Sequence, residues 1–467
     1  MHRVTTKDGV LWAESGTLLS DLLLAHAAVD HPCGGRGVCR KCMVLVDGQP
    51  QLSCQYRIES DIAVSGYEKQ EILSETGVHQ TSEVTEQLCF ALDMGTTTLA
   101  LALVSLDQGS IVRVVTATNP QRVYGADVMT RIEHCRKEGV QALQDCVVGR
   151  INVMIRSLDA PEVETMYVSG NVTMLHMLFG VDCASIGVAP YTPVFLEKQS
   201  VPGKDLGLQG VQIVESLPSI ASFVGADLVA GMNYVGMPPE GKFNLIIDLG
   251  TNAEIVLYSA AGALCTAAAA GPCFEGANIT CGSSAVCGAI YAYEGGAAKT
   301  VSDAPAKSIC GTGLVDVMAA LLREKIMDET GYMGCEKFFV SGNVFVDQQD
   351  VRQYQLAKSA ICAGILTLLS IWNVSFADIE TMYISGGFSA KINVENAVFT
   401  GLLPKQLEDK CVAIHNSSLL GTVKYACQHN DLSGYRDQAR YVDLSANQVF
   451  GKLFVENMTF LEALEEA

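Results

Sequence analysis

The chain opens on short apolar runs separated by turn residues. Apolar residues flank an Asp-Gly turn within 4–12, which predicts a β-hairpin. Leucine and alanine recur at helical spacing across 17–28, and 43–46 is an apolar run of strand length. This order predicts a small domain of mixed α and β structure over residues 1–69.

A run of acidic residues follows this first domain. Residues 59–86 contain seven carboxylates and a single lysine, and the apolar periodicity weakens beyond Ile72. A run of like charges is most often a solvated surface. We therefore predict a solvated linker over residues 70–87, without a docking role.

The rest of the chain repeats one pattern: an apolar strand, Asp-x-Gly-Thr, and a second apolar strand. The two copies begin at Cys89, with CFALDMGTTTLALALVSL, and at Leu245, with LIIDLGTNAEIVLY. A second element also recurs, as ETMYVSGN at 164–171 and ETMYISGG at 380–387. Four elements in this order indicate two lobes that arose by duplication. The predicted divisions are a first lobe at 88–240, a second lobe at 241–430 and a C-terminal extension at 431–467.

Composition places these elements in a globular protein of several domains. The chain has 467 residues, of which 49% are apolar and 18% charged. Its net charge of −20 argues against binding to nucleic acid or to an anionic membrane, because both require clustered basic residues. No run reaches about 18 strongly apolar residues, so we expect no transmembrane helix. The first residues lack a long apolar block, so we expect no signal peptide and a cytoplasmic location.

Four of the 17 cysteines lie within 22 residues, in the sequence HPCGGRGVCRKCMVLVDGQPQLSC. They are Cys33, Cys39, Cys42 and Cys54, with the spacing C-x5-C-x2-C-x11-C. Four thiolates at this spacing suit either Zn²⁺ or a [2Fe–2S] cluster. Glycines between the first two cysteines allow the loop to turn tightly. The sequence therefore predicts a metal centre here.

The surroundings of these cysteines favour iron–sulfur. Hairpin, helix, cysteine loop and strand occur in an order that resembles plant-type and succinate-dehydrogenase-type ferredoxin domains. In those domains a Leu-x-Cys element closes the site, as 52–54 does here. The resemblance implies a β-grasp fold that holds a [2Fe–2S] cluster. The first gap is five residues where plant-type ferredoxins have four, and zinc or unligated thiols remain the alternatives.

The repeated Asp-x-Gly-Thr pattern is suited to binding phosphate. Glycine lets the backbone approach a phosphate closely, while threonine and backbone N–H groups donate hydrogen bonds to it. The aspartate can hold a hydrated Mg²⁺ or orient the attacking water. The candidates are Asp93, Gly95, Thr96 and Thr97 in the first copy, Asp248, Gly250, Thr251 and Asn252 in the second, and Gly386 and Gly387 beside the nucleoside.

Three further residues carry weaker signals. His176 lies at helical spacing on an apolar face, so we predict a hydrogen-bonded core histidine. Lys358 is either a nucleotide contact or a solvated helical lysine. Glu254 either polarises water or is an ordinary carboxylate at a strand edge.

The four ordered elements resemble the superfamily of actin, sugar-kinase, acetate-kinase and heat-shock-chaperone ATPases. The resemblance implies two ribonuclease-H-like lobes that clamp ATP with Mg²⁺. The predicted fold class is therefore α/β of the α+β kind, with a β-grasp [2Fe–2S] ferredoxin domain ahead of two duplicated actin-like lobes.

Joined to the N-terminal cysteine domain, this body resembles the reductive activators of corrinoid proteins. The motifs CGGRGVCRKC, LDMGTTT, IDLGTNAEI and ISGGF carry the resemblance. It implies transfer of one electron from the cluster to Co(II) of a corrinoid protein in a methyltransferase system, with ATP hydrolysis driving formation of Co(I). It also implies an upstream electron donor and a homodimer. Several relatives have an extra domain where this chain has only its short linker.

Two other functions fit the same parts less well. One is an ATP-dependent activator of a radical dehydratase or ring reductase, although such relatives usually lack an N-terminal ferredoxin domain. The other is a non-catalytic, redox-sensing nucleotide-binding protein, which would not turn over ATP with its partners.

Overall fold

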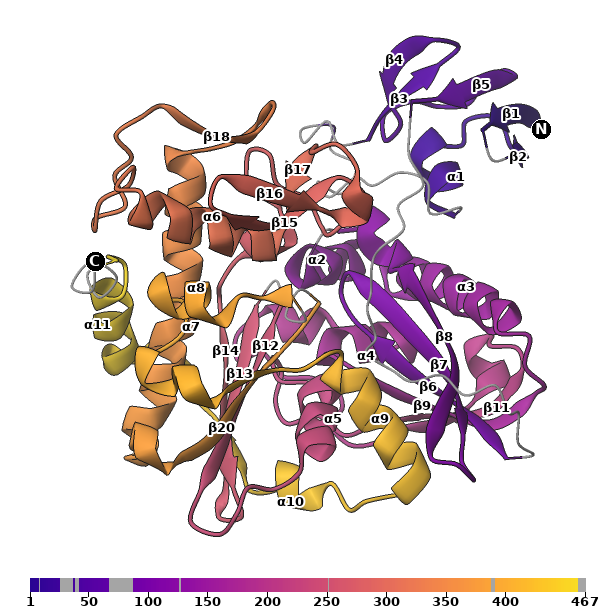
Figure 1. Cartoon of the computed structure of the whole chain (residues 1–467). Coiled ribbons are helices and arrows are strands. Elements are labelled where there is room, and N and C mark those ends of the chain that lie inside the picture. Colours follow the sequence, from indigo (N-terminus) through magenta and orange to yellow (C-terminus); the bar gives the residue numbers. More distant parts are fainter. Residues whose placement is uncertain are drawn as a thin grey trace.

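The computed structural model describes residues 1–7, 9–25, 37, 42–66, 87–125, 127–250, 252–387 and 391–460. Three of the predicted site residues lie outside these ranges: Cys33, Cys39 and Thr251. The predicted linker is described only at its last residue, Gln87. The described chain forms a small N-terminal domain and two larger lobes that lie side by side (Figure 1).

The N-terminal domain is a five-stranded sheet in the order β2-β1-β5-β3-β4 with one helix, α1. Its elements are β1 His2–Thr6, β2 Gly9–Ala13, α1 Leu19–Ala25, β3 Met43–Val46, β4 Gln49–Leu52 and β5 Ile62–Ser65. The central pair, β1 and β5, is parallel, and antiparallel hairpins extend the sheet on both sides. Val4, Leu19 and Ile58 are fully buried between the sheet and the helix. The predicted hairpin, helix and strand therefore all form.

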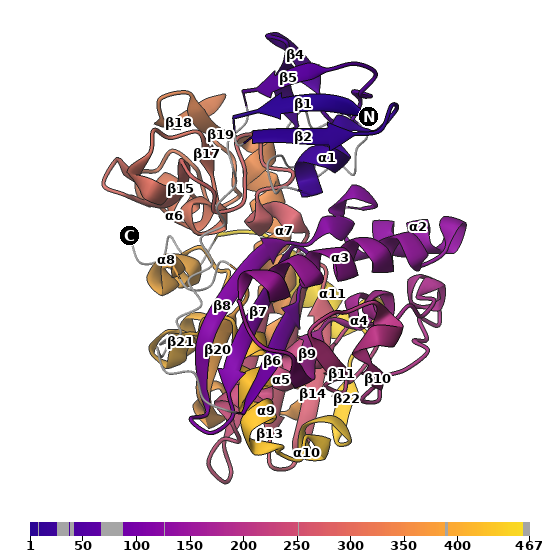
Figure 2. The ribbon, with the colours of Figure 1, turned by 90° about the vertical axis from the view of Figure 1, so that its right-hand side faces the viewer.

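The first lobe contains a six-stranded sheet in the order β10-β11-β9-β6-β7-β8. Its strands are β6 Leu88–Met94, β7 Thr98–Ser105, β8 Ser110–Thr118, β9 Val163–Gly170, β10 Ser200–Pro202 and β11 Val211–Ser216. Its helices are η1 Pro120–Val123, α2 Val128–Glu138, α3 Gln141–Ser157, α4 Val172–Leu178, η2 Ala184–Gly187, η3 Gly203–Leu206 and α5 Ala226–Val235. Helix α1 of the N-terminal domain lies near η1, beyond one end of the lobes in both views (Figures 1 and 2).

The second lobe contains a six-stranded sheet in the order β21-β20-β12-β13-β14-β22. Its strands are β12 Phe243–Leu249, β13 Ala253–Ser259, β14 Gly262–Ala268, β20 Ile379–Ser385, β21 Cys411–Ala413 and β22 Ala439–Tyr441. Smaller sheets are built from β15 Ala289–Glu294, β16 Ala297–Thr300 and β17 Ser308–Ile309, and from β18 Lys337–Ser341 and β19 Val344–Asp347. The helices are η4 Pro272–Glu275, η5 Val301–Asp303, α6 Gly311–Arg323, α7 Gln348–Trp372, η6 Phe376–Asp378, α8 Val394–Phe399, η8 Lys405–Lys410, α9 Ser417–Gln428, α10 Ser433–Arg436 and α11 Gln448–Glu456. The predicted mixed α/β class is confirmed.

The repeated sequence motifs occupy equivalent places in the two large sheets. β6 pairs with β9 in parallel and places Asp93 opposite Ser169. β12 pairs with β20 in the same way and places Asp248 opposite Ser385. Each Asp-x-Gly hairpin therefore begins beside the Ser-Gly end of the second motif in its own lobe.

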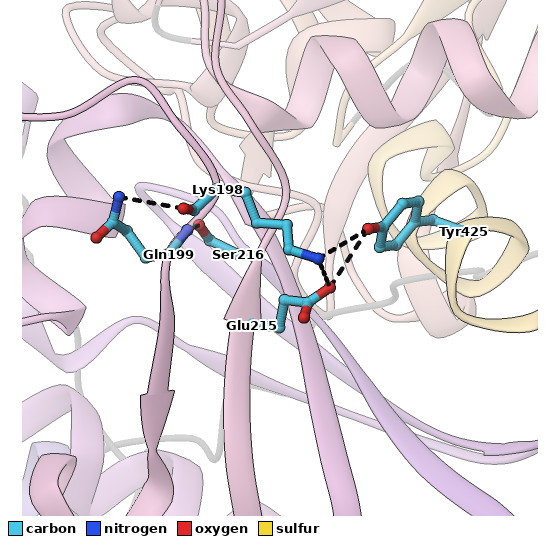
Figure 3. A network of polar contacts seen from close by, with 5 residues as sticks. All are labelled: Lys198, Gln199, Glu215, Ser216 and Tyr425. Atoms are coloured by element: carbon cyan, nitrogen blue, oxygen red, sulfur yellow. Dashed lines mark hydrogen bonds and ion pairs between the residues drawn. The ribbon is translucent and has the colours of Figure 1, made fainter. Parts of the chain in front are cut away.

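Helix α9 follows a strand of the second sheet but packs against α5, β6 and β9 of the first lobe. The two helices approach so closely that a Cβ on Gly421 would lie 1.8 Å from the carbonyl oxygen of Ala230. Only glycine permits this contact. Further along α9, Tyr425 donates to Glu215, and Lys198 donates to both residues (Figure 3). The helix is thus fixed to the first lobe over most of its length.

Helix α7 is the one helix in the described ranges whose length and composition would let it cross a membrane. In this structure, 72% of its most apolar window is buried. It lies in the core of the second lobe against β13 and β14. A buried core helix meets the same criteria of length and hydropathy.

Candidate functional site

The first repeated hairpin depends on a glycine. The N–H of Gly95 donates to the carbonyl oxygen of Thr98 at 3.0 Å and closes the turn between β6 and β7. A Cβ at Gly95 would lie 2.7 Å from that same oxygen. A larger residue would therefore push the hairpin open.

Three successive carbonyl groups of this hairpin are bound from one side. The Asn119 side-chain amide donates to Gly95 O at 2.9 Å, and its backbone N–H donates to Thr97 O at 2.9 Å. The Arg131 guanidinium donates to Thr96 O through Nη2 at 2.7 Å. These contacts fix the orientation of the peptide groups that were predicted to bind phosphate.

The carboxylate of Asp93, on β6, is held by the start of α9. Asn416 Nδ2 donates to Oδ2, and Ser418 Oγ donates to Oδ1, both at 2.7 Å. The Asn416 side chain also caps α9 by accepting from Leu419 N at 2.8 Å. Burial raises the pKa of Asp93, and these two donors oppose that shift.

The serines of the second repeated motif meet the same helix start. Ser169 Oγ lies 2.8 Å from Ser418 Oγ, and Ser385 Oγ lies 2.6 Å from Ser417 Oγ. Both lobes therefore contact consecutive residues of α9 through equivalent serines.

The second repeated hairpin is surrounded by carboxylates. Asp248 is the next-to-last residue of β12 and lies opposite Glu254 on β13, and Gly250 N–H donates to Asn252 O at 3.0 Å to close the turn. Burial, with the charge of Asp93, raises the pKa of Asp248 to about 6. Burial, with the charges of Asp227 and Asp248, raises the pKa of Glu254 well above its usual range.

Two acidic residues that the sequence reasoning missed complete this surface. Asp227, in the first turn of α5, has a pKa of about 7, raised by burial and then by the charge of Asp248. Glu275, on η4 of the second lobe, accepts from Thr97 Oγ1 of the first hairpin at 3.3 Å. A divalent cation would lower the repulsion within such a group of carboxylates.

The structure explains why a glycine follows the serine in both copies of the second motif. Gly386 has φ +108°, and a Cβ there would lie 2.2 Å from the carbonyl oxygen of Leu249. Gly170, its equivalent, has φ +157°, and a Cβ there would lie 2.6 Å from Met94 O. Gly387 is exposed. The close approach explains Gly386, and contact with a nucleoside stays a prediction for both Gly386 and Gly387.

The three residues with weaker signals have different outcomes. His176 is fully buried, with Nδ1 2.7 Å from Val172 O, and Nε2 accepts from Val194 N at 3.1 Å, so the core assignment is confirmed. Both interpretations of Lys358 are wrong, because its side chain is buried and donates to the carbonyls of Asn457 and Thr459 at 2.7 Å. Glu254 is the second residue of β13, at the end of the strand next to the hairpin, and both of its interpretations stay predictions.

Two of the four predicted cluster ligands are described, and they lie together. The sulfur atoms of Cys42 and Cys54 are 3.2 Å apart, and both residues are buried. Burial, followed by the neighbouring Cys42, raises the pKa of Cys54 to about 11. Among the residues that the structure describes, no three His, Cys, Asp or Glu side chains are placed to hold a metal ion. The complete cysteine set thus stays a prediction.

Two family models match this chain one after the other. The "RACo middle region" matches residues 88–240, and the "C-terminal domain of RACo the ASKHA domain" matches residues 242–466. The two matches together take in both lobes and nearly all of the chain beyond residue 87. The chain belongs to the RACo family of reductive activators of corrinoid proteins.

Two curated relatives of this RACo-family chain are named for the activation or the reduction of corrinoid proteins. It is 29% identical over 357 residues to "Corrinoid activation enzyme RamQ" from Eubacterium limosum, across 68% of this chain and 60% of that protein. It is 25% identical over 378 residues to "[Co(II) methylated amine-specific corrinoid protein] reductase" from Methanosarcina barkeri, across 70% of this chain and 68% of that one. The chain thus spans 60% of the length of the first of these relatives.

A solved structure shares the fold of this RACo-family chain along its whole length. It is described as "Reductive activator for corrinoid,iron-sulfur protein", with a TM-score of 0.73 and 24% sequence identity. The match covers 100% of both chains.

Several contacts around the two hairpins of this RACo-family chain had only a partial sequence signal. The run NSSLLG at 416–421 is typical of a helix start, which predicts a cap at Asn416 but not its contact with Asp93. Arg131 and Glu275 have no distinguishing local pattern. Their partners lie far away in the sequence, so only the folded chain brings them to the hairpins.

Proposed function

We propose that this chain is an ATP-hydrolysing iron–sulfur reductase that activates a corrinoid protein. In this proposal, one electron passes to Co(II) of the partner and yields the Co(I) form needed for methyl transfer. The observation that carries the proposal is a pair of equivalent Asp-x-Gly hairpins, joined through α9, in a chain of the RACo family. The names of both curated relatives support the choice of acceptor.

For the nucleotide, we place the ATP phosphates between the two hairpins. Backbone N–H groups and hydroxyls at Thr96 and Thr97 would bind them from the first lobe, and residues 250–252 from the second. Asp93 and Asp248 would hold Mg²⁺ or its waters, and the raised pKa of Asp248 supports a cation in this place. Gly386 and Gly387 would line the nucleoside.

For the electron-carrying group, we propose a β-grasp ferredoxin domain over residues 1–69. The parallel β1–β5 pair between two hairpins, with α1 on one face, is consistent with that fold. Cys42 and Cys54 fit a shared centre because both are buried and their sulfurs are adjacent. With Cys33 and Cys39 they would hold a [2Fe–2S] cluster, which supplies a one-electron carrier.

The remaining parts of the proposal rest on the family resemblance and on composition. They are a corrinoid protein of a methyltransferase system as the partner, an upstream electron donor, a homodimer, a cytoplasmic location and no interaction with nucleic acid or membrane. The proposed division into 1–69, 70–87, 88–240, 241–430 and 431–467 belongs with them.

ATP is needed because Co(I) is a strong reductant, so electron transfer to Co(II) is unfavourable without an added driving force. The chain can couple the two events only if its nucleotide-bound and nucleotide-free states differ in affinity for the Co(II) and Co(I) partners. Helix α9 touches both lobes and Asp93, so a change of the lobes that follows nucleotide binding would pass through it.

The first test is chemical analysis of protein purified without oxygen. We expect about two irons and two acid-labile sulfides per chain, with visible bands that bleach on reduction. The Cys54→Ser variant should lose the bands, while Cys265→Ser, which changes a buried cysteine of the second lobe, should keep them. A colourless protein that contains zinc would contradict the proposal.

The second test follows the corrinoid spectrum of a Co(II) partner with the reduced protein. We expect the Co(I) bands to appear with Mg–ATP and not without it. Equal rates with and without ATP would overturn the proposed role of the two hairpins. Electron transfer to a dehydratase component and not to a corrinoid protein would favour the alternative activator function.

A further inference from the structure

Arg131 is a fully buried arginine directly behind the first hairpin. It lies on α2, which places the guanidinium against η1, α4 and the turn that follows β6. Nε donates to Gly125 O at 2.9 Å and Nη2 to Thr96 O at 2.7 Å. Nη1 lies 3.4 Å from Gln121 Oε1 and 3.2 Å from the sulfur of Met174.

Every one of these partners is neutral. Asp127 and Glu275 are the carboxylates whose charges act on Arg131, and neither forms an ion pair with it in the described part of the chain. The nearby Arg122 adds a second positive charge. Burial lowers the pKa of Arg131 to about 9, so the side chain is still charged at neutral pH.

A buried charge without a counterion is costly, and proteins usually pair such a charge or neutralise it. Arg131 stays charged and has no counterion among the residues that the structure describes. It also binds the carbonyl in the centre of the hairpin, while Asn119 binds the carbonyls on either side. The positive charge is therefore placed immediately behind peptide groups whose orientation it helps to fix.

We propose that Arg131 is a positioning residue for the nucleotide phosphates: it orients the Gly95–Thr97 hairpin and supplies the positive field that selects a polyphosphate over an uncharged nucleoside. The inference rests on the proposed nucleotide site between the lobes. Arg131 acts through the hairpin and does not touch the ligand. The anion that it attracts takes the place of the missing internal counterion.

The test compares the binding of ATP and adenosine to the full-length protein by isothermal titration calorimetry. The quantity of interest is phosphate selectivity, defined as the ratio of the adenosine Kd to the ATP Kd. Arg131→Gln removes the charge and keeps an amide donor. We expect it to reduce phosphate selectivity about tenfold or more, with adenosine binding changed by less than about threefold.

A second variant tests the charge without removing the arginine. Gln121→Glu places a carboxylate beside Nη1 and gives Arg131 an internal counterion. The shape is nearly unchanged, and the new ion pair offsets the lost hydrogen bond from Gln121 Nε2 to Leu143 O at 3.0 Å, so this variant decides the matter if Arg131→Gln does not fold. We expect phosphate selectivity to fall about tenfold here too.

Arg113→Gln is the control for loss of a positive charge elsewhere in the first lobe. Arg113 lies on β8 of the same lobe and donates to the carbonyl of Leu158 at 2.6 Å, away from the hairpin. Phosphate selectivity should equal that of the wild type. A loss of the same size in this variant would show that the effect is not specific to Arg131 and would overturn the inference.

The outcomes separate the inference from the function on which it rests. If wild-type protein binds no ATP, the nucleotide site itself fails. If it binds ATP but both Arg131→Gln and Gln121→Glu keep wild-type selectivity, only the role of Arg131 fails. Equal losses of ATP and adenosine affinity would show that Arg131 merely supports the fold, which would also overturn the inference.

Discussion

The two repeated hairpins have the same strand framework but different electrostatic surroundings, although Glu275 also contacts Thr97 of the first. The first has a buried arginine and an asparagine behind it, and its aspartate receives two hydrogen bonds from α9. The second lies among carboxylates whose pKa values are raised by burial and by one another. Duplication therefore preserved the backbone, while the residues around it diverged.

This difference indicates that the two hairpins bind different parts of one ligand. A positive field behind the first hairpin favours an anion, and a group of partly protonated carboxylates at the second favours a cation. An Mg–ATP complex contains both an anion, the triphosphate, and a cation, Mg²⁺. The two sides can be altered separately, which makes the comparison testable.

The largest expected effect comes from Asp248. Asp248→Asn should lower steady-state ATP hydrolysis about 100-fold or more, because the amide can neither bind Mg²⁺ as strongly nor accept a proton. The rate of phosphate release at saturating ATP measures the loss of hydrolysis. Asp205→Asn, which changes an exposed carboxylate on η3, should have no effect. A wild-type rate in Asp248→Asn would remove the second hairpin from the chemistry.

The next effect is on stability and contrasts two lysines. Lys358 of the second lobe is buried, and its ammonium binds the carbonyls of Asn457 and Thr459. Lys358→Met should lower the free energy of unfolding by about 2 kcal/mol, because both carbonyls lose their donor. Lys424 of α9 also donates to a carbonyl, that of Asn233, but is only half-buried.

Urea unfolding of the two variants measures this contrast. Lys424→Met should cost only about 0.5 kcal/mol, because water can replace the lost donor. Equal costs would show that burial does not distinguish the two lysines.

A smaller effect tests the attachment of Asp93 to α9. Ser418→Ala removes one donor to the carboxylate and should lower the maximal rate of ATP hydrolysis about tenfold, with little change in the KM for adenosine nucleotides. Thr422→Ala is the control, since it removes a hydroxyl of the same helix that donates to Ser418 O at 2.8 Å and leaves Asp93 untouched. It should stay within about twofold of the wild type, and the reverse order of effects would contradict the assignment.

The smallest effect concerns Asp227 and pH. Because its pKa is raised to about 7, the folded protein keeps a proton that the unfolded chain loses above about pH 4. The free energy of unfolding should therefore fall as the pH rises from about 4 to about 7. Asp227→Asn should stabilise the nucleotide-free protein more at about pH 8 than at about pH 5, by about 1 kcal/mol.

Urea midpoints at the two pH values, without Mg²⁺, provide the measurement. A gain that is the same at both pH values would mean that Asp227 titrates normally.

The sequence predicted the parts of the site that repeat. Recurrence of ETMY-x-SG implied equivalent strands, and Ser169 and Ser385 do lie opposite the two aspartates. The apolar setting of His176 predicted a core position, which the structure confirms. These features are encoded locally, in strand and helix periodicity, so one sequence is enough to find them.

The contacts that distinguish the two hairpins were not predictable in this way. Asn416 and Ser418 are more than 320 residues from Asp93, and no periodicity links them. Lys358 looks like a surface residue of a helix because its partners are backbone carbonyls, which leave no trace in the sequence. The described part of the chain supplies these contacts only through tertiary packing.

The close contact between α5 and α9 has a mechanical consequence. A side chain at Gly421 would overlap the backbone of Ala230, so α9 cannot slide across α5, and the start of α9 stays fixed to the first lobe. Gly421 is one turn of helix, about 6 Å, beyond Ser417. Any movement of β20 against the first lobe must therefore be taken up at the contact of Ser385 with Ser417, one turn from that fixed point.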